Sequence, residues 1–130
     1  MLVLDENLPA EQRLLLRRWR IRFRVVGVDV AAWGTDDYNL LPLLHRLAQP
    51  TFFTLDGDFY RADWAHANCA LVWLDVTDDH AAEFIRRFLR HPDFDTQAKR
   101  LGIVARVHSG GINFWRVPGR SLQSAAWPVQ

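Results

Sequence analysis

The residues best suited to chemistry are aspartates that follow two apolar runs and open one helical segment. They are Asp5, Asp36, Asp37, Asp56 and Asp58. Carboxylates that are brought together repel one another unless a cation neutralises them. Oxygen ligands favour Mg²⁺ or Mn²⁺, and such ions assist phosphodiester hydrolysis by activating water and stabilising the attacking and leaving oxygens. The competing interpretation is structural, because Asp commonly caps helices and closes loops.

The elements that would position these acids alternate between strand and helix patterns. Short apolar runs predict buried strands at 2–4, 51–55 and 70–74, and strict alternation of Arg with apolar residues predicts another at 20–26. Apolar periodicity predicts helices at 9–19, at 36–48 and after Asp78 or Asp79, with a short helix at 93–101. In the second helix, either Asn39 is the cap and Pro42 lies in the first turn, or Asp37 is the cap and Pro42 kinks the helix.

The C-terminal part adds a hairpin signal, since Ser109, Gly110 and Gly111 separate apolar runs at 103–108 and 112–117. The whole order predicts an α/β fold with a mostly parallel sheet, helices on both faces and a C-terminal β-hairpin. We expect one domain at 1–120 and a loose tail at 121–130. Strand ends and helix starts share one edge of such a sheet, so the acids should converge there.

Composition sets the remaining limits. The chain has 130 residues and a net charge of +1, which fits one domain and indicates no particular partner. Its single cysteine, Cys69, excludes an internal disulfide and a cysteine-based zinc cluster. The chain contains no run of about 18 apolar residues, the length that a membrane-spanning helix needs. Asp5 interrupts the apolar start too early for a signal peptide, so we expect a cytoplasmic protein with no membrane contact.

Two motifs carry a family resemblance. Asp5-Glu6-Asn7-Leu8-Pro9 after the first strand, the helix-opening Asp37 and Thr-Leu-Asp-Gly-Asp-Phe at 54–59 together resemble PIN-like domains. The closest resemblance is to the bacterial subgroup that opens with this DENLP motif and is related to VapC-type toxins. It covers residues 1–76 well and the rest only loosely.

The resemblance implies a three-layer α/β/α fold and an endoribonuclease that depends on Mg²⁺ or Mn²⁺. Asp5, Asp37 and Asp56 would be the metal ligands and catalytic residues. Asp58 would support Asp56 or orient water, and Asp36 competes with Asp37 for the second ligand position. The secondary candidates are Glu6, Asn7, Asp36 and Arg61, of which Arg61 could contact the scissile phosphate. A toxin of this kind would also have an antitoxin protein as its partner.

Basic and aromatic residues supply candidates for RNA contact. Alternation would put Arg20, Arg22 and Arg24 on one strand face, where they could bind phosphates. The alternative is an edge strand whose charges discourage pairing. Trp33 and Trp64 lie in expected loops and could stack on bases, whereas Trp73 lies in an expected strand and should belong to the core.

Other functions fit the sequence less well. A phosphoacceptor receiver domain also has acids after its first and third strands, but Lys99, the only lysine, precedes a strand instead of following one. A dinucleotide-binding domain needs a glycine-rich turn where this chain has Asp5-Glu6-Asn7. The main alternative is a non-catalytic PIN-like module that binds RNA or a protein. An exposed hairpin and many aromatic residues also make a homodimer a candidate assembly.

Overall fold

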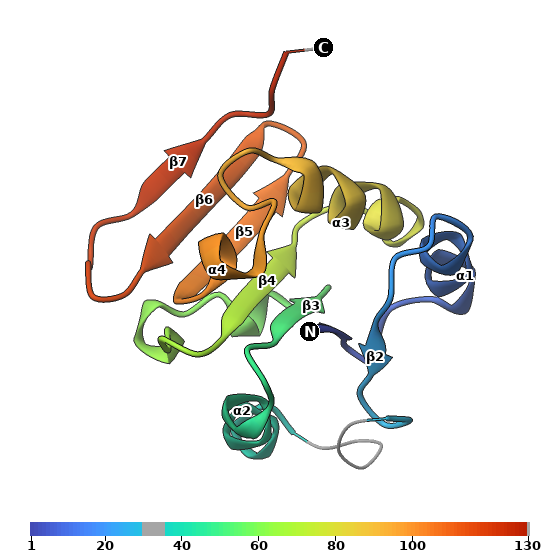
Figure 1. The fold of residues 1–130 in the computed structure, drawn as a ribbon, viewed down its shortest axis with the longest axis horizontal. Helices are drawn as coiled ribbons and strands as arrows, with labels where there is room; N and C mark the ends of the chain where they lie inside the picture. The colour runs from blue at the N-terminus through green and yellow to red at the C-terminus, as the bar shows by residue number, and fades with distance from the viewer. Residues whose placement is uncertain (30–35, 130) are drawn as a thin grey trace.

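The computed structural model describes residues 1–29 and 36–129, and Trp33 lies outside them. The strands are β1 (Leu2–Leu4), β2 (Arg24–Val25), β3 (Thr51–Thr54), β4 (Ala70–Leu74), β5 (Ile103–His108), β6 (Gly111–Arg116) and β7 (Gln123–Ala125). The helices are α1 (Ala10–Arg18), α2 (Asp37–Arg46), α3 (Ala81–Arg90) and α4 (Gln97–Arg100). Short 3₁₀ helices are η1 (Gly57–Phe59), η2 (Ala62–Trp64) and η3 (Asp78–His80) (Figure 1).

Within these described ranges, a sheet of seven strands has the order β2-β1-β3-β4-β5-β6-β7. The strands β2, β1, β3, β4 and β5 are parallel, whereas β6 runs antiparallel to β5 and β7 antiparallel to β6. The prediction of an α/β fold with a mostly parallel sheet is confirmed, and so is the hairpin, formed by β5 and β6.

Strand residues alternate between two apolar clusters on opposite faces of the sheet, because successive side chains of a strand point to opposite sides. Leu4, Phe53 and Val72 pack in one cluster with the apolar residues of α1 and α3. Their neighbours Val3, Phe52 and Leu71 pack in the other with Leu40 and Leu44 of α2 and Phe59 of η1. Helical segments therefore cover both faces, which is compatible with a three-layer α/β/α fold.

The prediction of a strand over 20–26 is largely wrong. Only Arg24 and Val25 pair with β1, through Val3 and Leu4. Arg20 follows α1 with a left-handed φ of 61°. The alternation is nevertheless real in burial over 20–24, because Ile21 and Phe23 pack against the core, whereas Arg20, Arg22 and Arg24 are exposed. A parallel ladder needs a partner strand, and β1 spans only Leu2–Leu4.

The prediction of a loose tail is wrong as well. Gln123–Ala125 form β7, which covers the edge of β6 that a bare hairpin would leave open. Beyond it, Trp127 packs against the core beside α3 and donates its indole N–H to the His108 carbonyl at 2.8 Å. β7 is now the last strand of the sheet, and the homodimer stays an expectation.

The remaining helices begin at other residues than expected, because other residues cap them or a 3₁₀ turn precedes them. Neither expected cap of the second helix is right, because Asp36 caps α2 by accepting from the Asn39 N–H at 2.9 Å, and Pro42 lies inside the helix. The 3₁₀ turn η3 occupies Asp78–His80, so α3 begins at Ala81. The helix expected at 93–101 shortens to α4, which Thr96 caps. Among the described residues, no helix is long and apolar enough to cross a membrane.

Candidate metal centre

The connections around β1 create a site at the carboxyl edge of the sheet, the edge where the parallel strands end. From β1 the chain passes through α1 to β2 on one side, and then through α2 to β3 on the other side of β1. These helices cover opposite faces, so their connections diverge at the ends of β1 and β3. Doubly wound sheets bind ligands at such a divergence. Asp5 follows β1 directly, and Asp56 follows β3 two residues after its end.

Asp37, Asp56 and Asp58 come together at this edge. One carboxylate oxygen from each lies within 4.8 Å of the other two. Asp37 is the first residue of α2, and Asp56 caps η1 by accepting from the backbone N–H of Asp58 at 2.9 Å. Helix capping therefore fixes the Asp56 carboxylate through one of its oxygens, so the structural role of Asp56 and its candidate role as a ligand do not exclude each other.

Asp5 lies beside this group but is not one of its three members among the described residues. It is 8 % exposed, and its oxygens accept from the Thr54 hydroxyl at 2.6 Å and the Glu6 backbone N–H at 2.8 Å. The same Thr54 hydroxyl accepts from the backbone N–H of Asp56 at 3.0 Å. Thr54 thus connects Asp5 to the loop that carries Asp56. Thr54 belongs to the Thr-Leu-Asp-Gly-Asp-Phe motif, but the sequence did not predict that its hydroxyl would bridge Asp5 and the Asp56 backbone.

Burial and mutual repulsion shift the titration of two of these acids. Burial raises the pKa of Asp37, and the negative charges of Asp56, Asp58 and Asp36 raise it further. Burial also raises the pKa of Asp5, as do the negative charges of Glu6 and Asp37, while the hydrogen bonds from the Thr54 hydroxyl and the Glu6 backbone N–H oppose that rise. A divalent cation would convert this repulsion into attraction. The donor set, three carboxylates, fits Mg²⁺ or Mn²⁺.

The secondary candidates have different surroundings. Asp36 uses both carboxylate oxygens on Asn39, at 2.9 and 3.0 Å, so it serves the helix start. The Asn7 side-chain oxygen accepts from the Leu55 N–H at 3.5 Å, which links the first loop to the end of β3. Glu6 contributes its backbone N–H to Asp5. These contacts favour Asp37 over Asp36 as the second ligand.

Arg61 lies at a pocket that contains two of the three grouped acids. The pocket has a volume of about 380 Å³ and is lined by Asp37, Tyr38, Gly57, Asp58, Arg61 and Trp64. The Arg61 guanidinium stacks 4.7 Å from the Trp64 ring centroid, pairs with Asp63 at 3.1 Å and contacts the Tyr38 hydroxyl at 3.4 Å. Tyr38 is 71 % exposed. It follows the helix-opening Asp37 directly, a signal that the sequence reasoning did not use.

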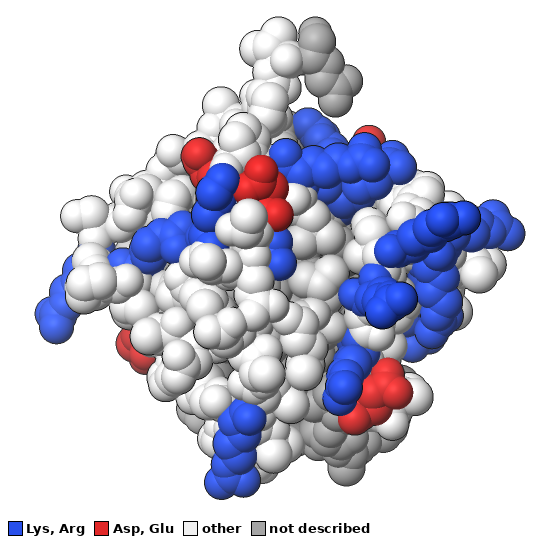
Figure 2. Space-filling view, viewed as in Figure 1, with Lys and Arg blue, Asp and Glu red and all other residues white. Residues whose placement is uncertain are grey.

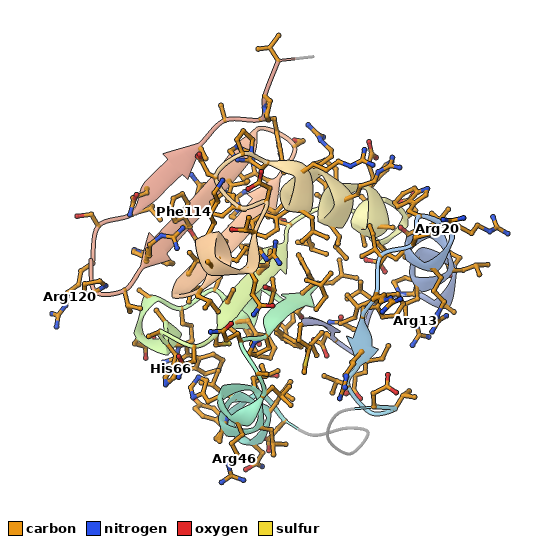
Figure 3. The ribbon with its side chains drawn as sticks, in the orientation of Figure 1. Arg13, Arg20, Arg46, His66, Phe114 and Arg120 are labelled. Carbon is orange, nitrogen blue, oxygen red and sulfur yellow. The ribbon has the colours of Figure 1, made fainter. Side chains whose placement is uncertain are left out.

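The basic residues expected to bind RNA are arranged differently from the expectation. Arg20, Arg22 and Arg24 are all exposed, but only Arg24 belongs to a strand, so they do not form one strand face. Figure 3 shows Arg20 on the side of the molecule where α1 lies. The structure also corrects Trp73, which is only partly buried and whose ring lies 5.5 Å from that of Tyr60.

The raised pKa of Asp37 predicts how stability depends on pH in the absence of metal. A folded-state pKa above the ordinary value of 3.8 means that the native state holds its proton more tightly than the unfolded state does. The free energy of unfolding should therefore fall as pH rises from 3.8 through the raised pKa of Asp37. Urea titrations in EDTA should show Asp37→Asn gaining stability over the wild type across this window. A constant difference in the free energy of unfolding at all pH values would contradict the raised pKa of Asp37.

No family model, no curated protein and no solved structure matches this chain.

Proposed function

We propose that this chain is a PIN-like ribonuclease that hydrolyses RNA phosphodiester bonds with Mg²⁺ or Mn²⁺. The observation that carries the proposal is that Asp37, Asp56 and Asp58 each place one carboxylate oxygen within 4.8 Å of the other two. They do so at the sheet edge where the connections from β1 and β3 diverge. The resemblance of the DENLP and Thr-Leu-Asp-Gly-Asp-Phe segments to PIN-like domains supports it. An antitoxin partner belongs to the same proposal and rests on that resemblance alone. A cytoplasmic location is also proposed, and it rests on the early acid Asp5 in the apolar start of the chain.

Each acid has a distinct part in the proposed chemistry. Asp37, Asp56 and Asp58 would hold the cation, and Asp5 stands beside them as the further ligand that the family resemblance implies. A divalent cation held there would supply an activated water and offset the charge of the phosphate. Thr54 keeps the Asp5 carboxylate in place and ties it to the Asp56 loop. The contacts of Asp5 and Asp56 within the fold thus preorganise the site before substrate arrives.

The pocket beside the acids supports an RNA strand as the substrate. Arg61 presents a guanidinium next to Asp58, and a guanidinium suits a phosphate because its N–H groups match the phosphate oxygens. Tyr38 and Trp64 place two aromatic rings in the same pocket, 5.6 Å apart. Tyr38 is exposed and Trp64 half-buried, and aromatic rings that reach the surface stack on unpaired bases, so we propose single-stranded RNA as the form that is cut.

Calorimetric titration with Mn²⁺, followed by an RNA cleavage assay, tests this function. The wild type should bind Mn²⁺ and cut a labelled RNA only when the metal is present. Asp56→Asn keeps an oxygen to cap η1 but removes one negative charge, so it should bind Mn²⁺ at least about tenfold more weakly. Asp78→Asn is the matched control, because Asp78 is exposed in η3, outside the acid group, and carries the same charge.

The outcomes separate the proposal from its alternative. Equal Mn²⁺ affinity in wild type and Asp56→Asn would contradict a metal site at these acids. Metal-independent RNA binding without cleavage would replace the nuclease by a non-catalytic binding module.

A further inference from the structure

A second charged surface lies apart from the acids, on the helices that cover the opposite face of the sheet. The helices α1 and α3 contact each other there. Their arginines, with Arg20 just after α1, form what we call the α1–α3 arginine face: Arg13, Arg17, Arg18, Arg20, Arg86, Arg87 and Arg90. Figure 2 shows basic side chains gathered on the side where Figure 1 has α3 and α1. The acids Asp37 and Asp58 belong to α2 and η1, which pack on the other face.

Aromatic rings hold several of these guanidiniums in place. Arg86 lies 3.7 Å from the ring centroid of Trp19, and Arg87 lies 4.4 Å from that of Trp127. Among residues 1–29 and 36–129, Arg86, Arg87 and Arg90 have no carboxylate oxygen within ion-pair distance. Stacking thus orders the guanidiniums of Arg86 and Arg87, and none of the three charges is ion-paired, which preorganises this group for an external anion.

The face includes a pocket of about 580 Å³ between α3 and the C-terminal segment. Arg86, Arg87 and Arg90 line it together with Trp127 and His91, against one carboxylate, Glu83.

His91 is buried and its tautomer follows from its contacts. Nδ1 accepts from the Asp93 N–H at 3.0 Å, so Nε2 carries the proton that it donates to the Ala126 carbonyl at 2.8 Å. Apart from His91, the charged side chains that line the pocket are three arginines and Glu83, so positive charge prevails there.

We propose that the α1–α3 arginine face binds the phosphodiester backbone of a nucleic acid, with the pocket beside Trp127 at one end of the contact. Guanidinium forks match phosphate oxygens in pairs. The arginines extend over two adjacent helices, which suits a polymer with regularly spaced charges better than one small anion. The proposal deepens the proposed function by giving the RNA strand a binding surface outside the acid centre. It is tested without metal, so either idea can fail alone.

The experiment measures fluorescence anisotropy of a labelled 12-nucleotide RNA, and of DNA of the same sequence, with the full chain in EDTA. Arg87→Gln/Arg90→Gln removes two charges of the face. Arg46→Gln/Arg120→Gln is the matched control, because both residues are exposed and Figure 3 places them away from Arg13 and Arg20. Each lost phosphate contact lowers the salt dependence of binding by about 0.7 log units per log unit of salt. The first variant should bind about tenfold more weakly at low salt, and the control should bind like the wild type.

Four outcomes would overturn the proposal. The first is wild-type RNA binding too weak to detect at low salt, and the second is an unchanged RNA affinity in folded Arg87→Gln/Arg90→Gln. The third is an equal loss of RNA affinity in the control variant. The fourth is tighter binding of an oligoglutamate of equal charge, which would assign the face to an acidic protein partner. Arg87→Lys/Arg90→Lys keeps the charge, so its recovery of binding would show that a loss in the Gln variant is not a folding defect. Tighter binding of RNA than of DNA would identify RNA as the source of the backbone.

Discussion

Asp37→Asn should reduce Mn²⁺-dependent RNA cleavage by at least about a hundredfold, because several kcal/mol of transition-state stabilisation depend on a correctly held cation. Asp37 is the acid that brings α2 into the group with Asp56 and Asp58. Burial, together with the negative charges of Asp56, Asp58 and Asp36, raises its pKa, so the charged form of Asp37 is disfavoured in the metal-free protein. The same substitution should therefore stabilise the metal-free protein at neutral pH while it removes activity. Steady-state cleavage of a labelled RNA, with denaturation curves in EDTA, measures both effects.

Asp36→Asn is the control for this substitution. It removes the same charge one residue earlier, and Asn caps helices as well as Asp does. The Asp36 side chain contacts Asn39, so its loss should leave metal binding and cleavage within about twofold of the wild type. If Asp36→Asn were as inactive as Asp37→Asn, the second ligand would be Asp36, or the charge of the whole segment would matter more than the position of one carboxylate.

Phe59→Ala should destabilise the fold by about 3–5 kcal/mol and also weaken Mn²⁺ binding by about tenfold or more. Phe59 is 1 % exposed and ends η1, the turn that carries Asp56 and Asp58. Its ring packs 5.1 Å from that of Phe52 and 5.7 Å from that of Trp64. Truncation removes the anchor that holds the acid loop against the sheet, so the carboxylates lose their fixed spacing.

Phe88→Ala separates the two effects of that truncation. Phe88 is fully buried in the other apolar cluster, against Phe53 and Phe94, and truncating it should cost a similar free energy of unfolding. It lies in α3, away from η1, so the folded protein should keep its Mn²⁺ affinity. Urea denaturation and calorimetry of both variants below their unfolding temperatures make the comparison. Equal losses of Mn²⁺ affinity would show that the site depends on global stability and not on the Phe59 anchor.

Local patterns were reliable where one short segment decides its own structure. The apolar runs at 2–4, 51–55 and 70–74 are buried strands, and the helix periodicity of 81–90 is α3. They failed where a second segment is needed. Burial alternates only from Arg20 to Val25, and within 20–26 only Arg24 and Val25 pair with β1. Gln123–Ala125 show little strand pattern, yet β6 offers them an open edge.

The same division applies to the candidate centre. The sequence by itself determined that acids stand at the ends of β1 and β3 and at the start of α2, because strand ends and helix caps are local features. Only the tertiary structure decided which of them meet. It groups Asp58 with Asp37 and Asp56. It also gives Asp36 a hydrogen bond from Asn39, and it buries Asp5 with a hydrogen bond from Thr54. Distances between carboxylates depend on how α2 and η1 pack over the sheet, and no single segment encodes that packing.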